Sequence, residues 1–297
     1  MFLFSSAFAE VAETVEETVE AVATAAPEAA QTDAVAEYIS SVFKKFSGFS
    51  LSTWVILGVL VALGLILLAA AKSGKKWTAK TIAYAALSIA LSFVLSYIRL
   101  FRMPQGGSIT PASMLPLMLF SASFGVAPGV VAGLAYGILQ YLQGGDFLNV
   151  WQFLLDYPIA FAALGLAGLY KHLNKTWQAY AALAVMFAGL LLLCMSYPSL
   201  WVLYAVLMVA VVVLFFVCRK NPDGARLLPA MGIAVLGRAV SAVCAGLIWV
   251  AVYPLEDPNE IPLVYSLVYN GAYLLPEAAI CMVLAFITGN RIMKAMK

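Results

Sequence analysis

Long apolar runs alternate with short polar, glycine- or proline-containing breaks along most of this chain. A membrane helix needs about 20 mainly apolar residues, because it crosses ~30 Å of hydrocarbon at ~1.5 Å per residue. Several runs after residue 77 meet or approach that length, and we expect helices near 79–101, 112–124, 127–143, 151–170, 177–195, 199–218, 228–253 and 262–289. Another run at 51–71 precedes them. The pattern predicts an all-α polytopic membrane protein.

Composition agrees with this fold class and narrows the function. Hydrophobic residues make up 64% of the chain and charged residues 11%, whereas soluble domains have roughly 25% charged residues. A net charge of +2 gives no reason to expect a nucleic-acid partner. The four cysteines lie in or beside apolar runs without CxxC spacing, so we expect no disulfide framework, no metal site and no cofactor. Residues 1–50 carry scattered glutamates and are typical of a solvated acidic tail.

Basic residues predict the orientation, because short cytoplasmic loops are enriched in lysine and arginine. Nine crossings with the N-terminus outside and the C-terminus cytoplasmic place 12 of the 17 basic residues inside. Those residues are Lys72, Lys75, Lys76, Lys80, Lys171, Lys175, Arg219, Lys220, Arg226, Arg291, Lys294 and Lys297. Arg99 and Arg102 fall outside against the rule, and the acidic loop 256–260 falls outside in agreement with it.

Few polar side chains lie at membrane depth, where an ionisable group is costly and is a functional candidate. They are Asp156, Arg238, Glu277 and Asn270, and the aromatic residues Trp151, Tyr157, Trp249, Tyr265, Tyr269 and Tyr273 accompany them. A carboxylate among aromatic rings suits a flat cationic ligand, through charge attraction, stacking and cation–π contact. Alternatively, Asp156 pairs with Arg238 as a structural ion pair, and the aromatic residues form an interfacial belt. For Glu277 we favour helix packing or a partner-facing role.

The segment PQGGSITPASMLP (104–116) interrupts the apolar pattern with glycines, prolines and hydroxyls. Irregular backbone survives at membrane depth only where it lines a protein cavity, so this segment is a candidate wall of a binding site. The chain has no HExxH, GxSxG or Walker A motif. We therefore expect a protein that is not an enzyme and that cannot drive transport with its own ATP hydrolysis.

Three motifs in order carry a family resemblance: PQGGSITPASMLPLMLFSASFGVAPGVVAGLAYGILQ (104–140), QFLLDYPIAFAALGLAG (152–168) and YSLVYNGAYLLPE (265–277). They resemble the thiamine-specific substrate-binding subunits (S components, ThiT type) of energy-coupling factor (ECF) vitamin transporters. The likeness covers about residues 79–171 and 228–289. It implies a six-helix S-component core that captures thiamine at the outer face of the cell membrane. It also implies partners, namely a transmembrane coupling subunit and two ATPase subunits.

The resemblance implies a division of the chain and a set of site residues. Residues 77–176 would hold S-component helices one to four and 227–297 helices five and six, while the helix at 51–76 and the apolar hairpin at 177–226 would be accessory. The expected ligand contacts are Asp156, Tyr157, Tyr265, Asn270 and Gly246, joined by Trp249 and Trp151 near the polar cluster. Two positions depart from the family: Ala242 stands where a pocket histidine is usual, and Val250 where an aromatic residue is usual.

A small-residue pattern on the first helix of the module suggests how partners dock. Ala79, Ala83, Ala86 and Ala90 resemble the AxxxA surface through which S components meet the coupling subunit. Ordinary packing within the chain is the alternative. A related pyrimidine precursor or another small cationic heterocycle is the second choice of ligand, and a membrane enzyme or a scaffold are the remaining functional alternatives.

Overall fold

The computed structural model describes residues 77–104, 106–173, 175–257 and 259–296. The predicted tail at 1–50 and the accessory helix at 51–76 lie outside these residues. Six described segments are long and apolar enough to cross a membrane, and Leu115–Phe124 and Val126–Leu142 are shorter apolar helices. The prediction of an all-α polytopic membrane fold is confirmed.

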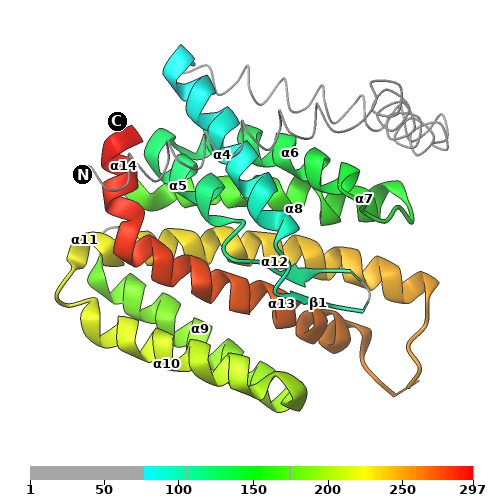
Figure 1. Cartoon of the computed structure of the whole chain (residues 1–297). Coiled ribbons are helices and arrows are strands. Elements are labelled where there is room, and N and C mark those ends of the chain that lie inside the picture. Colours follow the sequence, from blue (N-terminus) through cyan, green and yellow to red (C-terminus); the bar gives the residue numbers. More distant parts are fainter. Residues whose placement is uncertain (1–76, 105, 174, 258, 297) are drawn as a thin grey trace, which may run out of the picture. The chain divides into compact units, whose positions relative to one another are not determined.

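The elements follow one another in a simple order (Figure 1). The first half contains α4 (Ala79–Tyr97), β1 (Phe101–Arg102), β2 (Ser108–Ile109), α5 (Leu115–Phe124), α6 (Val126–Leu142), α7 (Val150–Asp156), α8 (Pro158–Ala162) and the 3₁₀ helix η1 (Ala163–Lys171). The second half contains α9 (Thr176–Ser196), η2 (Pro198–Leu200), α10 (Trp201–Val217), α11 (Pro222–Ala225), α12 (Leu227–Val252), α13 (Pro262–Leu284), the π-helical turn η3 (Ala285–Gly289) and α14 (Asn290–Met296).

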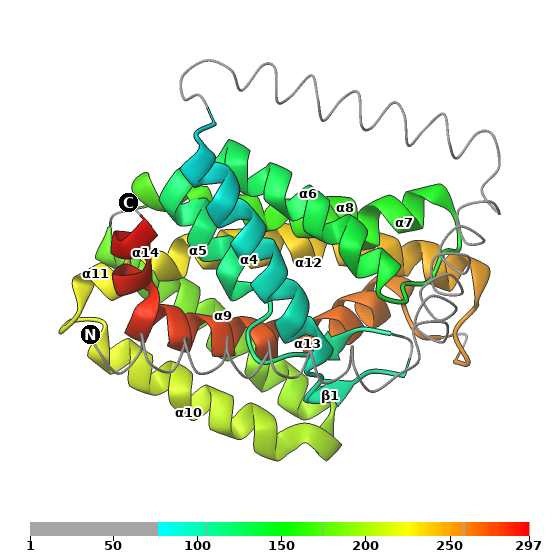
Figure 2. The ribbon, with the colours of Figure 1, turned by 45° about the horizontal axis from the view of Figure 1, so that its top comes forward.

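Helices α12 and α13 pack against each other in the middle of the described region. The α9–α10 hairpin lies on one side of this pair and contacts α13, while α4 to α8 lie on the other side (Figures 1 and 2). The hairpin is fixed by apolar packing and by the buried Tyr204 hydroxyl, which donates to the Ala272 carbonyl at 3.4 Å. Its outward face carries exposed Val185, Leu192 and Phe216, as a lipid-facing surface requires.

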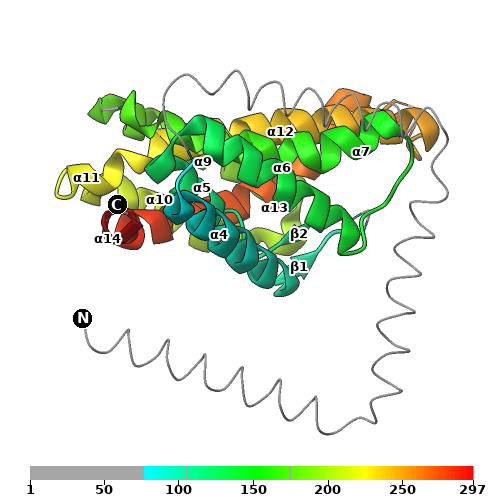
Figure 3. The ribbon, with the colours of Figure 1, turned by 90° about the horizontal axis from the view of Figure 1, so that it is seen from above.

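The first predicted boundary that differs is the end of the helix at 79–101. Helix α4 ends at Tyr97, and Phe101–Arg102 pairs with Ser108–Ile109 as a two-stranded antiparallel hairpin. Strand β2 lies against α13 (Figure 3). The following helix begins at Leu115 and not at 112, because Ala112 has a left-handed backbone with φ 71°. The irregular segment is therefore longer than the apolar pattern predicted.

The predicted helix at 151–170 is a broken helix in the structure. It comprises α7, α8 and η1, with the break at Tyr157, whose φ and ψ are −115° and −81°. Pro158 explains the break, since proline disfavours the helical conformation of the residue before it and has no N–H to donate. The break falls immediately after Asp156, which is the last residue of α7.

Glycines on α6 bring the broken helix close. A Cβ at Gly133 would collide with the carbonyl oxygen of Phe161, and one at Gly137 with that of Tyr157. Small residues four apart let helices approach closely. Residues 157–161 therefore pack directly on the α6 backbone, which fixes the segment that follows Asp156.

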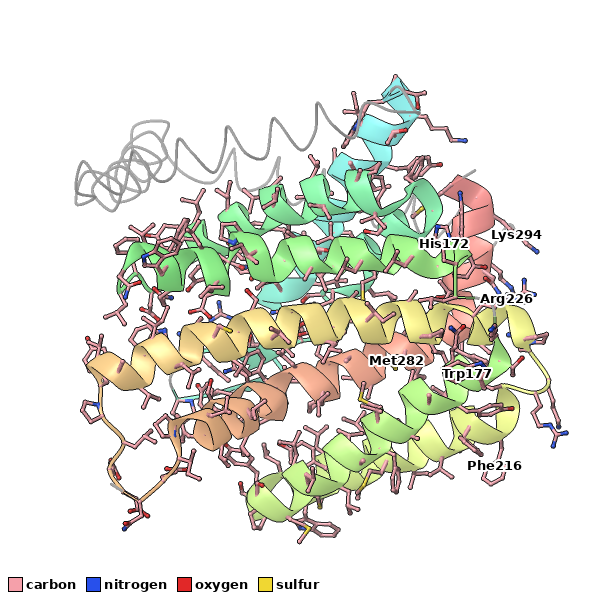
Figure 4. The ribbon with its side chains drawn as sticks, turned by 180° about the vertical axis from the view of Figure 1, so that it is seen from behind. His172, Trp177, Phe216, Arg226, Met282 and Lys294 are labelled. Carbon is pink, nitrogen blue, oxygen red and sulfur yellow. The ribbon has the colours of Figure 1, made fainter. Side chains whose placement is uncertain are left out.

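Basic residues gather at one end of the described helices, where Figure 4 shows His172, Arg226 and Lys294 near one another. The Tyr84 hydroxyl donates to the Ala295 carbonyl at 3.3 Å, which places the start of α4 beside α14 at this end. The opposite end contains the β1–β2 hairpin, the α6–α7 loop and the acidic loop between α12 and α13. The two ends thus differ in charge.

Candidate binding cavity

A cavity of about 880 Å³ opens at the end of the helices away from the basic cluster. Four segments form its walls: 96–113, 140–161, α12 with the loop after it, and α13 as far as Glu277. The motif at 104–116 contributes Pro104, Gly106, Gly107, Ser108, Thr110 and Ser113. The expectation that this irregular segment lines a cavity agrees with the geometry.

One face of α12 supplies a complete wall. Arg238, Ala242, Gly246 and Val250 are four residues apart and all line the cavity, together with Trp249. Side chains at this spacing lie on one side of an α-helix. With alanine at 242 and valine at 250, the aromatic surface of this wall comes from Trp249 and from Tyr253, which is stacked on it with centroids 5.6 Å apart.

Asp156 is held in the cavity wall through one of its carboxylate oxygens. Oδ2 accepts a hydrogen bond from Gln152 Nε2 at 2.6 Å and a longer one from Trp249 Nε1 at 3.4 Å. Gln152 is fully buried, and its Oε1 accepts from the Leu148 N–H at 2.9 Å. Oδ1 accepts no hydrogen bond from the described residues, so this oxygen is available to a ligand in the cavity.

Arg238 lines the same cavity but forms no salt bridge with a described residue. Its guanidinium Cζ lies 4.3 Å from the centroid of the Phe161 ring, within cation–π range. Nη1 is buried and has no hydrogen-bond partner among the described residues. The ion pair between Asp156 and Arg238, considered above as the structural alternative, is therefore not formed.

Tyr157 supports the mouth of the cavity through its hydroxyl. The Asp146 N–H donates to the Tyr157 hydroxyl oxygen at 2.9 Å, and the ring lies against Gly145 where a Cβ would be only 2.6 Å away. Tyr141 packs edge-on against the Tyr157 ring, with centroids 5.4 Å apart. The structure thus gives Tyr157 a second role, which is to order the α6–α7 loop.

Asn270 uses much of its hydrogen-bonding capacity inside the protein. Its Nδ2 donates to the Ser266 carbonyl at 2.9 Å and to the Ala242 carbonyl at 3.3 Å, and its Oδ1 accepts from the Tyr273 hydroxyl at 2.7 Å. A Cβ at Gly246 would collide with Ser266 Oγ. Gly246 therefore permits the close approach of α12 and α13 in addition to lining the cavity.

A row of tyrosines on α13 faces the 104–116 motif. Tyr265 and Tyr269 are stacked with centroids 6.0 Å apart, and Tyr273 follows one turn later. The Tyr269 hydroxyl donates to the Gly106 carbonyl at 3.1 Å, and the Tyr273 ring covers Gly107. The tyrosine row therefore holds the wall formed by the 104–116 motif in place, and it also forms the α13 wall of the cavity.

Six of the seven predicted contact residues line this one cavity: Asp156, Tyr157, Gly246, Trp249, Tyr265 and Asn270. Trp151 does not line it and is 64% exposed. The reason is helical geometry, because Gln152 and Asp156 share the inward face of α7 and a residue adjacent to Gln152 points about 100° away. The structure therefore brings six of the predicted residues together and leaves Trp151 outside the cavity.

Sequence reasoning missed Gln152, named Tyr269 only as one of the accompanying aromatic residues, and favoured helix packing or a partner-facing role for Glu277. Gln152 precedes Asp156 by four residues, and Tyr269, Tyr273 and Glu277 are also four apart. Extending the helical spacing from Asp156 and Tyr265 would have identified all of them. Within the described residues no group of three or more His, Cys, Asp or Glu side chains could hold a metal ion.

The predicted docking residues Ala79, Ala83, Ala86 and Ala90 are all exposed on α4. The opposite face of the helix is buried and carries Thr81, Ala85, Ser88, Ser92 and Ser96. Packing within the chain, the alternative considered for these alanines, therefore does not involve them in the described region.

Comparisons with known proteins agree on one family. The model of the thiamine transporter protein family (Thia_YuaJ) matches residues 82–297. The thiamine transporter ThiT of Bacillus subtilis is 30% identical over 200 residues, which cover 66% of this chain and 83% of that protein. The thiamine transporter ThiT of Lacticaseibacillus paracasei is 38% identical over 60 residues, 19% of this chain and 30% of that protein.

A solved structure shares the fold. ThiT from Listeria monocytogenes aligns with a TM-score of 0.51 at 19% identity, over 73% of this chain and 96% of that chain.

Proposed function

This chain belongs to the thiamine transporter protein family, and from that premise we propose that it captures thiamine as the substrate-binding subunit of an ECF-type importer. Membership makes it a multi-pass membrane protein of transport and not an enzyme. The observation that carries the ligand proposal is a fixed carboxylate, Asp156, in a cavity walled by Trp249, Tyr265 and Tyr269. Thiamine combines a cationic thiazolium with a flat aminopyrimidine, and this wall offers charge attraction and stacking to both.

Two residues of the α12 wall are the reason for considering a second candidate ligand. Ala242 and Val250 line the α12 wall with small aliphatic side chains, so this wall has no imidazole to bind a ring nitrogen. Trp249 supplies the aromatic surface instead. A pyrimidine precursor of thiamine or another small cationic heterocycle is the alternative ligand.

The orientation follows from the two charged ends. The basic end, which carries Arg226 and Lys294, faces the cytoplasm under the positive-inside rule. The cavity then opens to the outside, together with Arg99 and Arg102, which line its mouth. In this proposal, Arg99 and Arg102 lie outside against the positive-inside rule because they line the cavity that receives the ligand.

Partner subunits supply the energy in this proposal. The exposed alanine face of α4 is the surface expected to meet the transmembrane coupling subunit, since small residues allow close helix contact. Two ATPase subunits would act through that coupling subunit.

Titration of the purified full-length chain with thiamine tests the ligand proposal. We expect a calorimetric signal at micromolar or lower concentrations and quenching of tryptophan fluorescence, because Trp249 lines the cavity. Trp249→Phe should remove most of the quenching, whereas Trp151→Phe should retain it because that side chain lies outside the cavity. Binding of a pyrimidine precursor without binding of thiamine would replace the ligand and keep the S-component role. Uptake of thiamine by vesicles that contain only this chain would contradict the role of the partners.

A further inference from the structure

Glu277 lies deep in the cavity wall, although its position after Pro276 suggested helix packing. It is 1% exposed, and it lines the same cavity as Asp156 and Arg238. Its Oε1 accepts hydrogen bonds from Thr110 Oγ1 and Ser113 Oγ, each at 2.6 Å.

The two hydroxyls converge on one oxygen of the Glu277 carboxyl group. Thr110 and Ser113 both donate to Oε1, so the wall at 110–113 is attached to this one oxygen. Oε2 accepts no hydrogen bond from the described residues, so half of the carboxylate remains without a donor.

Charged residues lining the cavity fall into two groups. At the mouth the side chains are exposed and therefore screened by water and salt: Arg99, Arg102, Asp146, Glu256 and Glu260. Farther inside are Asp156, Arg238 and Glu277, none of which is exposed. Taken as ionised, their charges of −1, +1 and −1 sum to −1, whereas Asp156 and Arg238 alone would sum to zero.

We propose that Glu277 is a specificity-determining residue of this site, which makes the inner cavity net negative and so selects a monocation over a neutral molecule of the same shape. The inference rests on the proposed function, since it explains how the cavity distinguishes a cationic heterocycle from its neutral analogue. Asp156 orients the ligand from the α7 wall, and Arg238 cancels one negative charge. Glu277 then supplies the charge that the ligand balances, and a side chain that is 1% exposed is screened less than one at the surface.

The test measures a ratio of affinities. Calorimetry on the full-length chain compares thiamine with an analogue in which a neutral thiophene ring replaces the thiazolium. In Glu277→Gln the thiamine affinity should fall at least about tenfold, as expected for loss of a full charge interaction, while the affinity for the neutral analogue changes much less. Ser113→Ala is the matched control, because it removes a hydrogen bond to Glu277 but no charge, and should leave the ratio of the two affinities unchanged.

Arg238→Gln provides a second variant with an effect of opposite sign. Removing the positive charge leaves the inner cavity with two negative charges, so the preference for thiamine over the neutral analogue should rise. If Glu277→Gln alone does not fold, the double variant Arg238→Gln with Glu277→Gln decides the question, because it should lose the gain in preference that Arg238→Gln alone shows.

Equal losses for both ligands in Glu277→Gln would show that the residue only holds residues 110–113 in place, and would overturn the proposal. Unchanged ratios in both variants would also overturn it while leaving thiamine capture intact. If the unmodified chain binds no thiamine, the proposed function fails together with this inference.

Discussion

The substitution Asp156→Asn separates ligand binding from folding at the centre of the cavity. It keeps the shape of the side chain and removes its charge. An amide oxygen in the place of Oδ2 can still accept from Gln152 Nε2 and Trp249 Nε1, the two donors that now hold the carboxylate at 2.6 and 3.4 Å. We therefore expect the position of the side chain to persist.

The expected loss of affinity follows from the free carboxylate oxygen. A hydrogen bond to a charged group contributes roughly 1.5–3 kcal/mol, and each 1.4 kcal/mol is about a tenfold change in Kd. Asp156→Asn should therefore weaken thiamine binding by about 10- to 150-fold, measured by calorimetry. Asp257→Asn is the matched control, because Asp257 is exposed and does not line the cavity.

Stability should respond differently. Removing one partner of a buried ion pair typically costs about 3–5 kcal/mol, but Asp156 and Arg238 form no salt bridge. We expect the ligand-free melting temperature to change little. Unchanged affinity would remove Asp156 from the site, and a large fall in ligand-free melting temperature would show that Arg238 depends on its charge despite the absence of direct contact.

Two further substitutions test the helix contacts. Gly246→Ala should destabilise the ligand-free protein by about 1–3 kcal/mol through overpacking, because its Cβ would collide with Ser266 Oγ. Gly232→Ala on the same helix should be tolerated, since its Cβ would make ordinary contacts with Ala182 Cβ at 3.6 Å and Met282 Cε at 3.8 Å, and equal melting temperatures for the two variants would refute the packing role. The double substitution Ala86→Trp with Ala90→Trp should leave thiamine binding intact and abolish ATP-driven uptake in vesicles that also contain the coupling subunit and ATPases. The control Val185→Trp, on the exposed face of α9, should support uptake. Full uptake by the double variant would exclude α4 as the docking face.

The apolar pattern predicted the helices better than their ends. Long runs identify membrane helices because lipid forces every backbone group to pair inside its own segment. The ends depend on local backbone conformation. The helix is broken after Asp156 by Pro158, and α5 begins later than predicted because Ala112 has a left-handed backbone. Pro158 was visible in the sequence, whereas Ala112 lies between Thr110 and Ser113, whose hydroxyls bind Glu277 on a helix far away in the chain.

The site was predictable to the extent that helical spacing reveals a shared face. Tyr265 and Asn270 lie on the cavity side of α13, but Trp151 was assigned by proximity to Asp156 along the chain and points elsewhere. Helical spacing from Tyr265 reaches Glu277, but the hydrogen-bond partners of Glu277 could not be predicted from the sequence. Its partners Thr110 and Ser113 are 167 and 164 residues away, and only the tertiary fold brings them together.

The irregular segment and α13 together explain how this cavity exists at membrane depth. Ala112 holds φ 71°, a conformation that costs a non-glycine residue roughly 1–2 kcal/mol, and it lies between the two residues whose hydroxyls bind Glu277. The Tyr269 hydroxyl binds the Gly106 carbonyl farther along the same segment. Helix α13 therefore binds polar groups of this wall and also presents the tyrosine row to the cavity. The same helix supports the wall and provides the surface on which we expect the ligand to lie. A change on α13 that moves the wall should therefore alter ligand affinity even where the altered side chain does not touch the ligand.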